Sequence, residues 1–509
     1  MAVGEIEQDV ATGADEVRRA IQRARGAQAN WADTPVGERA AAVRRIRDAI
    51  VEQADELAEI IARDTGKTRI DALATEVLPS ATAAAWYSKQ AAKWLKDRRI
   101  PASNVVTGNK KTVIRRVPCG VIGIISPWNY PFTIPFSEVI MGLLAGNAVI
   151  LKVATRTQAT GRALAELVAD AVPTDVFQYV DVPGRVAGDA FLSGGVNKLF
   201  FTGSVEVGKE LMAKAAETLT PVVLELGGND PMLVCADADL DRATSGAVWA
   251  GLQNAGQSCG GVERIYVDSS IADAFVDQLA AKVETLRVGP DRGEHDIDIG
   301  SMTTAEQAGK VRRQVEDAVQ QGAVIRAQAK PPEGSDEMFL PAVVLTNVDH
   351  SMDVMREETF GPVLCVVPVA SMDEAVNLAN DCDLALTASV WSRDRRAADE
   401  LARRLQAGVV TINDHLMSHG LPEAPWGGFK QSGIGRSHGQ LGFDEMTQPQ
   451  TIVHDNMGFL KKNLWWHPYD AGLYAGIRGL IDAMHGRSLG QRMSGLRKVT
   501  RIVPRTWRK

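Results

Sequence analysis

Cysteine is scarce in this chain of 509 residues. The five cysteines stand far apart, their number is odd, and no two of them have the CxxC spacing. A disulfide framework and a zinc site are therefore not expected, and a reducing cytoplasm suits such a chain. We expect no metal cofactor.

Long apolar runs and an N-terminal targeting signal are also missing. No stretch reaches the roughly 18 consecutive apolar residues that a membrane-spanning helix needs. The N-terminus reads MAVGEIEQDV, without a basic region followed by an apolar run, so no secretory signal is predicted. These two features favour a cytoplasmic protein.

An excess of positive charge is absent as well. The formal net charge is −7, which argues against general binding to nucleic acid. The charge is unevenly spread along the chain. Residues 456–509 contain eleven Lys and Arg side chains against two aspartates, so this segment carries +9 and the rest of the chain carries −16.

The length and the 45% share of hydrophobic residues predict a globular protein of two or three domains. Apolar residues recur at helical spacing from about residue 13 to residue 96, with charged residues on the other faces, so surface-lying helices are predicted there. Residues 99–118 follow a different pattern. Val105, Val106 and Thr112 indicate a short hairpin or arm.

Apolar strands and helices then alternate in two regions that meet at Gly227-Gly228. This alternation is typical of an α/β fold with parallel sheets covered by helices. A cleft between two such domains is a common place for an active site. Strands are predicted at residues 121–126, 148–153, 199–202, 264–267, 342–345, 363–367 and 409–412. Helices are predicted at residues 162–171, 208–218, 271–288, 305–321 and 373–380.

Two short stretches carry residues suited to chemistry on a carbonyl group. Glu225 stands between two leucines, and a carboxylate in apolar surroundings resists ionisation and suits proton transfer near neutral pH. Cys259 stands among small residues, where a substrate could approach its thiol. We hypothesise that Cys259 attacks a carbonyl and that Glu225 later activates water. Alone, such a Glu is usually surface charge and such a Cys is usually buried as a small hydrophobe.

Other strand ends offer groups that could bind a cofactor. Gly203 and Ser204 follow a predicted strand and open a helix, which favours either a phosphate or an ordinary helix cap. Lys152 ends a strand, where it could bind a ribose or lie in solvent. Thr155 and Arg156 follow without an acidic residue nearby, and this leaves NADP open beside NAD.

Asn129 lies between two prolines after another predicted strand. Its amide could donate to a developing oxyanion, or it could bond its own backbone in a turn.

Seven motifs follow one another along the chain in an order that resembles the aldehyde dehydrogenase superfamily. The resemblance covers about residues 13–453 and implies two doubly wound parallel-sheet domains, one of them Rossmann-like, with a small β arm for oligomerisation. The motifs are Pro127-Trp128-Asn129, Gly146-Asn147 before Lys152, Phe201-Thr202-Gly203-Ser204, Glu225-Leu226-Gly227-Gly228, Gly256-Gln257-Ser258-Cys259, Glu358-Thr359-Phe360-Gly361-Pro362 and residues 425–433.

The resemblance implies a role for each matching residue. Cys259 is the expected nucleophile, and Asn129 with the backbone N–H of Cys259 is expected to stabilise the oxyanion. Glu225 is expected to activate the water that hydrolyses the thioester. NAD or NADP is the expected cofactor, with Glu358 at the nicotinamide ribose and Lys152 at the adenosine ribose. The full set of expected cofactor contacts is Ser126, Trp128, Lys152, Thr155, Gly203, Ser204, Leu226, Glu358 and Phe360.

The chain departs from the family at the cofactor and substrate positions. Val153-Ala154-Thr155 follow Lys152 where the family often has Pro-x-Glu, which weakens a strict preference for NAD. The segment 225–232 is similar to branches that include carotenoid-dialdehyde and semialdehyde dehydrogenases. No Arg lies between Asn129 and Arg156 to receive a substrate carboxylate, so an apolar aliphatic or aromatic aldehyde is predicted. The alternatives are a semialdehyde dehydrogenase and an acylating, CoA-dependent enzyme; Glu225 counts against the latter.

The predicted domains are residues 1–98 with 119–227 for the dinucleotide, 228–430 for catalysis, and 99–118 with 440–455 for an oligomerisation arm that would build a homodimer or homotetramer. Residues 456–509 form a basic, amphipathic extension with several aromatic residues. It could lie on an anionic membrane, or it could dock on the acidic body or on a neighbouring subunit. Charge complementarity favours docking slightly.

Overall fold

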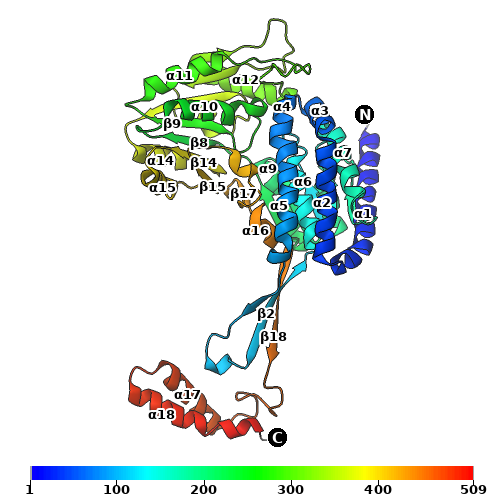
Figure 1. Cartoon of the computed structure of the whole chain (residues 1–509), viewed down its shortest axis with the longest axis vertical. Coiled ribbons are helices and arrows are strands. Elements are labelled where there is room, and N and C mark those ends of the chain that lie inside the picture. Colours follow the sequence, from blue (N-terminus) through cyan, green and yellow to red (C-terminus); the bar gives the residue numbers. More distant parts are fainter. Residues whose placement is uncertain (1–2, 508–509) are drawn as a thin grey trace. The chain divides into compact units, whose positions relative to one another are not determined.

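The computed structural model of the protein describes residues 3–507 and contains two compact units (Figure 1). The larger unit consists of the chain up to Lys96 and of Arg116–Gln448. The smaller unit consists of Asp97–Arg115 and of the chain from Pro449 onward. The fold is mixed α/β with parallel sheets, as the sequence predicts.

The first sheet of the larger unit has six strands in the order β17-β7-β6-β3-β4-β5. Five of them are parallel, and only the edge strand β17 runs antiparallel to its neighbour. The strands are β3 (Val121–Ile125), β4 (Ala148–Lys152), β5 (Phe177–Tyr179), β6 (Lys198–Thr202), β7 (Val222–Glu225) and β17 (Gly433–Ile434).

Helices cover both faces of this sheet. Alternate residues of β3 point to opposite sides, with Ile122 and Ile124 in one apolar core and Val121 and Ile125 in the other. The first core also contains residues of α2 (Val36–Glu52), α3 (Ala54–Thr65), α5 (Leu78–Trp94), α6 (Thr133–Ala145) and α7 (Gln158–Ala169). The second core contains residues of α1 (Val3–Asp33), α8 (Gly184–Gly194) and α9 (Val205–Thr218).

The second sheet of the larger unit has seven strands in the order β10-β11-β12-β9-β8-β14-β15. It is parallel except for β10, the antiparallel edge strand. The strands are β8 (Asp230–Val234), β9 (Val262–Asp268), β10 (Val324–Ala329), β11 (Ala342–Thr346), β12 (Val363–Val369), β14 (Thr387–Trp391) and β15 (Val409–Ile412). Its helices are α10 (Leu240–Leu252), α11 (Ala272–Glu284), α12 (Ala305–Gln320), α13 (Asp353–Arg356), α14 (Met372–Asn380) and α15 (Arg395–Ala402).

Short elements complete the larger unit. A two-stranded sheet pairs β13 (Leu384–Ala385) with β16 (Phe429–Lys430). Between α3 and α5 lie the helix α4 (Arg69–Ala72) and a π-helical turn η1 (Leu73–Val77), and the remaining turns are η3 (Thr155–Thr157), η4 (Gln253–Gly256) and η5 (Met417–Gly420).

The smaller unit contains a three-stranded sheet and a helical hairpin. The sheet has the order β1-β2-β18, from β1 (Arg98–Ile100), β2 (Lys110–Pro118) and β18 (Thr447–Asp455). The extension forms α17 (Ala471–His485), α18 (Leu489–Thr500) and the turn η6 (Val503–Trp507). In the described part of the chain, we find no helix that is both long and apolar enough to span a bilayer.

One prediction about the arm is wrong in detail. The prediction placed residues 440–446 in the arm, but they belong to the larger unit, where α16 (Gly439–Glu445) forms because Phe443 and Met446 are buried. Phe443 packs edge-on against Tyr87, with 5.5 Å between ring centroids. The predicted hairpin is present: β1 and β2 pair antiparallel, and Val105 and Val106 belong to the 3-10 turn η2 (Val105–Thr107) between them.

Candidate active site

Three cavities of the larger unit meet at Cys259. The largest has a volume of about 380 Å³, the second about 280 Å³, and the third about 20 Å³. Among the residues that the structure describes, only Cys259 lines all three. The smallest cavity has room for about one water molecule. A group bound in either large cavity would therefore have access to the sulfur.

The loop that carries Cys259 is held in an uncommon conformation. Asn254 and Ala255 both have positive φ angles, 51° and 53°, just before Gly256 at 70°. The side chain of Gln257 fixes this loop. Its Nε2 donates to the carbonyl of Asn254 at 3.0 Å, and its Oε1 accepts from the backbone N–H of Thr303 at 2.9 Å. Strain of this kind persists where the surrounding contacts impose it, and functional sites are common places for it.

Asn129 is buried beside this loop. Its Nδ2 donates to the carbonyl of Gln257 at 3.1 Å. An amide nitrogen carries two hydrogens, so this bond leaves one for a substrate oxygen. The prediction that Asn129 serves as an oxyanion donor is thus compatible with its position.

A buried ion pair holds the Asn129 segment in place. Lys67 Nζ lies 2.6 Å from Glu76 Oε1, and both side chains are inaccessible to solvent. Lys67 also donates to the carbonyl of Asn129 at 2.8 Å, and Glu76 Oε2 accepts from the backbone N–H of Phe132 at 2.7 Å. Sequence analysis missed this pair because its helical region resembles a surface layer with charged outer faces.

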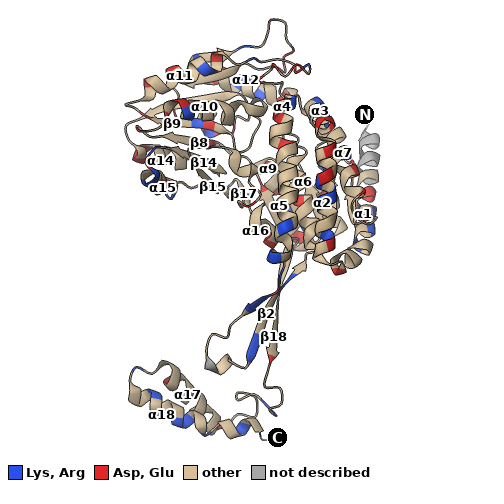
Figure 2. Ribbon diagram, in the orientation of Figure 1, with Lys and Arg blue, Asp and Glu red and all other residues tan. Residues whose placement is uncertain are grey.

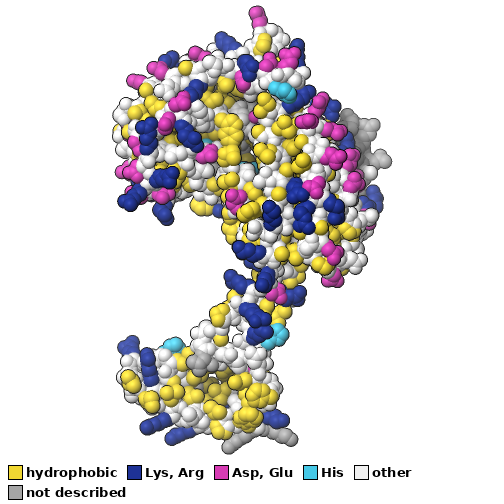
Figure 3. Space-filling view, in the orientation of Figure 1, with side chains coloured by type: hydrophobic (Ala, Val, Ile, Leu, Met, Phe, Trp, Pro, Cys, Tyr) yellow, Lys and Arg dark blue, Asp and Glu magenta, His cyan; other side chains and the backbone are white. Residues whose placement is uncertain are grey.

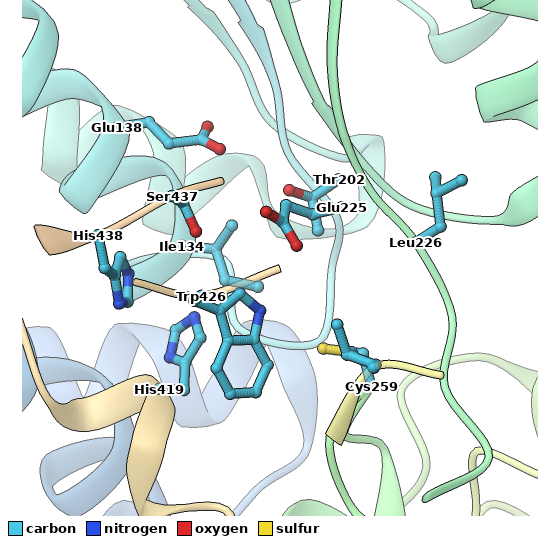
Figure 4. A pocket seen from close by; sticks show the side chains of 11 residues that line it. Ile134, Glu138, Thr202, Glu225, Leu226, Cys259, His419, Trp426, Ser437 and His438 are labelled. Carbon is cyan, nitrogen blue, oxygen red and sulfur yellow. The ribbon is translucent and has the colours of Figure 1, made fainter. Parts of the chain in front are cut away.

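Glu225 ends β7 and is only 6% exposed. It lines the 20 Å³ cavity, which Ser437 also lines, and the 380 Å³ cavity. Burial raises its pKa well above the usual value, the neighbouring carboxyl of Glu138 raises it further, and Arg436 and hydrogen bonding from Ser437 oppose both. In Figure 4 the carboxyl groups of Glu138 and Glu225 point toward each other. Such a carboxyl can exchange a proton near neutral pH.

The thiol of Cys259 is protonated at rest. Burial raises its pKa, and the carboxyl groups of Glu358, Asp230 and Glu225 raise it further. A base must therefore take the proton when the sulfur attacks. Glu225 lines two of the three cavities that contain Cys259.

Glu358 lines the 380 Å³ cavity, and its side chain contacts the backbone that follows β7 of the first sheet. Its Oε1 accepts from the backbone N–H of Gly228 at 2.9 Å, and a Cβ on Gly227 would lie 2.6 Å from its Oε2. A larger residue at this position would push the Glu358 carboxylate away from the backbone. Burial raises the pKa of Glu358 to about 7, against the hydrogen bond from Gly228 and the charge of Lys310.

A second buried carboxyl positions the residues that follow Glu358. The two oxygens of Glu263 accept from the backbone N–H groups of Thr359 at 2.9 Å and of Phe360 at 2.8 Å. Phe360 then packs edge-on against Trp128 at 5.5 Å between ring centroids. Sequence analysis missed Glu263, because a Glu inside a strand carries no signal of its own.

The predicted cofactor residues divide into two groups. Trp128, Gly203, Ser204, Leu226, Glu358 and Phe360 line the 380 Å³ cavity, together with Gln307, Lys310 and Arg313 of α12, which sequence analysis missed. Ser204 caps the 14-residue helix α9, so backbone N–H groups are available there for a phosphate. The polar rim, the helix end and the glycine-walled pocket at Glu358 fit a dinucleotide.

Ser126, Lys152 and Thr155 do not line that cavity. Ser126 is buried after β3, and its hydroxyl has no partner among the described residues. Lys152 is buried at the end of β4, its Nζ lies 3.6 Å from where a Cβ on Gly184 would stand, and burial lowers its pKa. Thr155 is exposed in η3. Their assignment to the cofactor rests on the motif alone.

Comparison with known proteins decides the family. The sequence profile described as "Aldehyde dehydrogenase family" matches residues 4–452. The chain belongs to this family. It is 39% identical over 471 residues to 4,4'-diapolycopene aldehyde oxidase from Methylomonas sp, a match that spans 92% of this chain and 87% of the relative.

Solved aldehyde dehydrogenases share the fold. Succinate-semialdehyde dehydrogenase from Burkholderia pseudomallei superposes with a TM-score of 0.83 at 36% identity, over 87% of this chain and 90% of that chain. NAD-dependent aldehyde dehydrogenase from Sinorhizobium meliloti gives a TM-score of 0.83 at 34% identity, over 90% and 88%. The relatives include enzymes named for NAD and for NADP. This aldehyde dehydrogenase is accordingly an oxidoreductase that depends on NAD or NADP.

Proposed function

We propose that the enzyme oxidises an apolar aliphatic or aromatic aldehyde to the carboxylic acid through a thioester on Cys259. The observation that carries the proposal is the meeting of three cavities at this one sulfur. The polar cavity suits the dinucleotide, the 280 Å³ cavity suits the aldehyde, and the smallest one suits the hydrolytic water.

The first half of the reaction takes place between Cys259 and Asn129. The thiol loses its proton to solvent, and the sulfur attacks the carbonyl carbon. The free N–H of the Asn129 amide and the backbone N–H of Cys259 donate to the resulting oxyanion. The residues around the 380 Å³ cavity would hold NAD or NADP, which would supply the acceptor for the hydride that leaves this carbon. The carbon then remains joined to Cys259 as a thioester.

The second half of the reaction depends on Glu225. In its ionised form it takes a proton from water, and the oxygen attacks the thioester carbon. The carbon–sulfur bond breaks, the carboxylic acid leaves, and Cys259 recovers a proton. A CoA-dependent transfer would need no such base, so the buried Glu225 supports hydrolysis.

The lining of the 280 Å³ cavity supports an apolar substrate. It includes Leu78, Ile134, Trp249, Met417 and Trp426, and no Lys or Arg occurs among the described residues around it. His419 also lines it, but burial lowers the pKa of this imidazole to about 4, so it is neutral at pH 7. A substrate carboxylate would find no cation here, and a buried unpaired charge is costly.

The alternative is a semialdehyde dehydrogenase, which the Burkholderia pseudomallei relative favours by its name. Turnover of propanal to dodecanal and of succinate semialdehyde, measured by the absorbance of the reduced cofactor with NAD and with NADP, separates the two. We expect kcat/KM to rise with chain length and to fall by about 10⁴-fold or more in Cys259→Ala. Faster turnover of succinate semialdehyde than of octanal would overturn the apolar assignment.

We further propose that the enzyme is cytoplasmic and that the arm joins copies into a homodimer or homotetramer. All five cysteines are free, which suits a reducing compartment. The exposed strand β18 offers backbone groups for pairing. Light scattering on the eluate of a gel-filtration column would determine the number of subunits, and a monomer would contradict the second proposal.

A further inference from the structure

The helical hairpin of the extension packs through small residues. A Cβ on Gly479 would lie 2.8 Å from the carbonyl oxygen of Gly495, and one on Gly495 would lie 2.3 Å from that of Gly479. The described large apolar side chains buried inside this hairpin are Leu473 and Ile502. Close helix packing through glycines leaves the larger side chains no space between α17 and α18.

The extension instead presents its large apolar side chains to the outside. The described part of the chain exposes 28 large hydrophobic residues, and twelve of them lie in residues 457–507. Six of the eight exposed aromatic residues are there as well, and Figure 3 shows hydrophobic side chains gathered over the hairpin. These six are Phe459, Trp465, Trp466, Tyr469, Tyr474 and Trp507. Trp and Tyr are the residues enriched where a protein meets the interface of a bilayer.

The same segment has more cations than acidic residues, and both of its aspartates are already in ion pairs. Asp470 pairs with Arg505 at 2.8 Å. Asp482 pairs with Arg478 at 2.5 Å and lies 3.8 Å from Lys498. In the part of the chain that the structure describes, the remaining cations have no ion-pair partner. They are Lys461, Lys462, Arg487, Arg492, Arg497 and Arg501. Figure 2 shows Lys and Arg positions in blue along α18.

We propose that the hairpin and its flanking aromatics form a docking face for an anionic lipid bilayer. Exposed Trp and Tyr would lie at the headgroup level, the apolar side chains would enter the boundary of the hydrocarbon, and the unpaired cations would face lipid phosphates. Neither helix spans the bilayer, so the contact is peripheral. A folded protein partner would need one apolar site fitted to all these side chains, whereas a bilayer accepts them in any arrangement.

Flotation of the full-length enzyme with lipid vesicles tests this face. The vesicles are phosphatidylcholine alone or phosphatidylcholine mixed with phosphatidylglycerol. We expect the enzyme to float with the mixed vesicles, not with phosphatidylcholine, and to be released by high salt. In the triple variant Trp466→Ser, Tyr474→Ser, Trp507→Ser, the partition coefficient of the enzyme between vesicles and water should fall at least about tenfold. Arg487→Glu with Arg497→Glu should do the same.

Matched substitutions at Val51→Ser and Leu219→Ser, which are 64% and 87% exposed in the larger unit, should leave flotation unchanged. An unchanged circular dichroism spectrum and melting temperature show that each variant is folded, which keeps this experiment separate from the question of the substrate. Flotation of the triple variant equal to that of the parent would overturn the proposal, as would no flotation of the parent. A smaller oligomer for the triple variant in gel filtration, without flotation of the parent, would assign the face to a second copy of this chain.

Discussion

The two large cavities on either side of Cys259 are built in opposite ways. The side proposed for the dinucleotide is lined by charged and polar groups, among them Glu306, Gln307, Lys310 and Glu358, and its shape comes from backbone held by buried carboxyls. The side proposed for the aldehyde has no Lys or Arg in the described lining and is walled mainly by apolar side chains. One side is thus polar and the other is apolar. The two sides should therefore respond to substitution independently.

The largest effect on turnover is expected from Glu225, which lies near Cys259, where the two large cavities meet. Glu225→Gln removes the base that serves the thioester, so steady-state turnover of octanal should fall by about 10²–10⁴-fold. The thioester itself should still form. Rapid mixing should show one burst of reduced cofactor per active site, and mass spectrometry should find the acyl group on Cys259. Loss of the burst together with turnover would mean that Glu225 is needed for the attack as well.

A smaller effect should be confined to the aldehyde side. Leu78→Arg places a cation at the lining of the 280 Å³ cavity, where Leu78 is 64% exposed. We expect the ratio of kcat/KM for succinate semialdehyde to that for octanal to rise by about 10–100-fold, since charged hydrogen bonds of this kind are strong. The KM for the cofactor should not change. Leu219→Arg, remote from the lining, is the control; an equal rise there would discredit the assignment.

A substitution on the dinucleotide side should change the KM for the cofactor and leave the preference among aldehydes unchanged. In Glu358→Gln the amide oxygen can still accept from Gly228, but it binds a hydroxyl group less strongly than a carboxylate does. We expect the KM for NAD or NADP to rise by about tenfold while the dependence on aldehyde chain length stays the same. A changed preference among aldehydes would show that the two sides are coupled.

The smallest effect concerns the carboxyl that faces Glu225 in the 20 Å³ cavity. Glu225 acts as a base only when ionised, so hydrolysis quickens as pH rises through its pKa. Glu138 raises that pKa, and Glu138→Gln should move the acidic limb of the kcat profile to lower pH, by less than about one unit. Arg436 lowers the pKa of Glu225, and Arg436→Gln should move the limb to higher pH. If the acidic limb moved in the same direction in both variants, the charges of Glu138 and Arg436 would not be the cause of the shifts.

Local patterns in the sequence predicted seven of the strands and singled out three candidate catalytic residues that line one cavity. Strands such as 148–153 are recognisable because their residues are buried on both faces and read as continuous apolar runs. The motifs of Cys259, Glu225 and Asn129 are equally local. β8 escaped prediction because Asp230 and Pro231 open it, and both features disfavour strands by themselves.

The supports of the site could not be read from the sequence, because they join distant segments. Glu263 holds Thr359 across 96 residues, and Lys67 holds Asn129 across 62. Each is a charged residue whose burial is decided by the partner that it meets in the folded chain. The short segment 440–446 was misassigned for a similar reason, since Phe443 finds its aromatic neighbours only in three dimensions.

The exposed aromatics on and beside the helical hairpin would also change how the enzyme searches for its substrate. An enzyme held at a bilayer moves in two dimensions, and a long-chain aldehyde dissolved in that bilayer is met by lateral diffusion. Its rate would then follow the mole fraction of aldehyde in the lipid and not its concentration in the whole solution. Adding vesicles without aldehyde would slow the full-length enzyme by surface dilution, while a short aldehyde that stays in water would be oxidised at an unchanged rate.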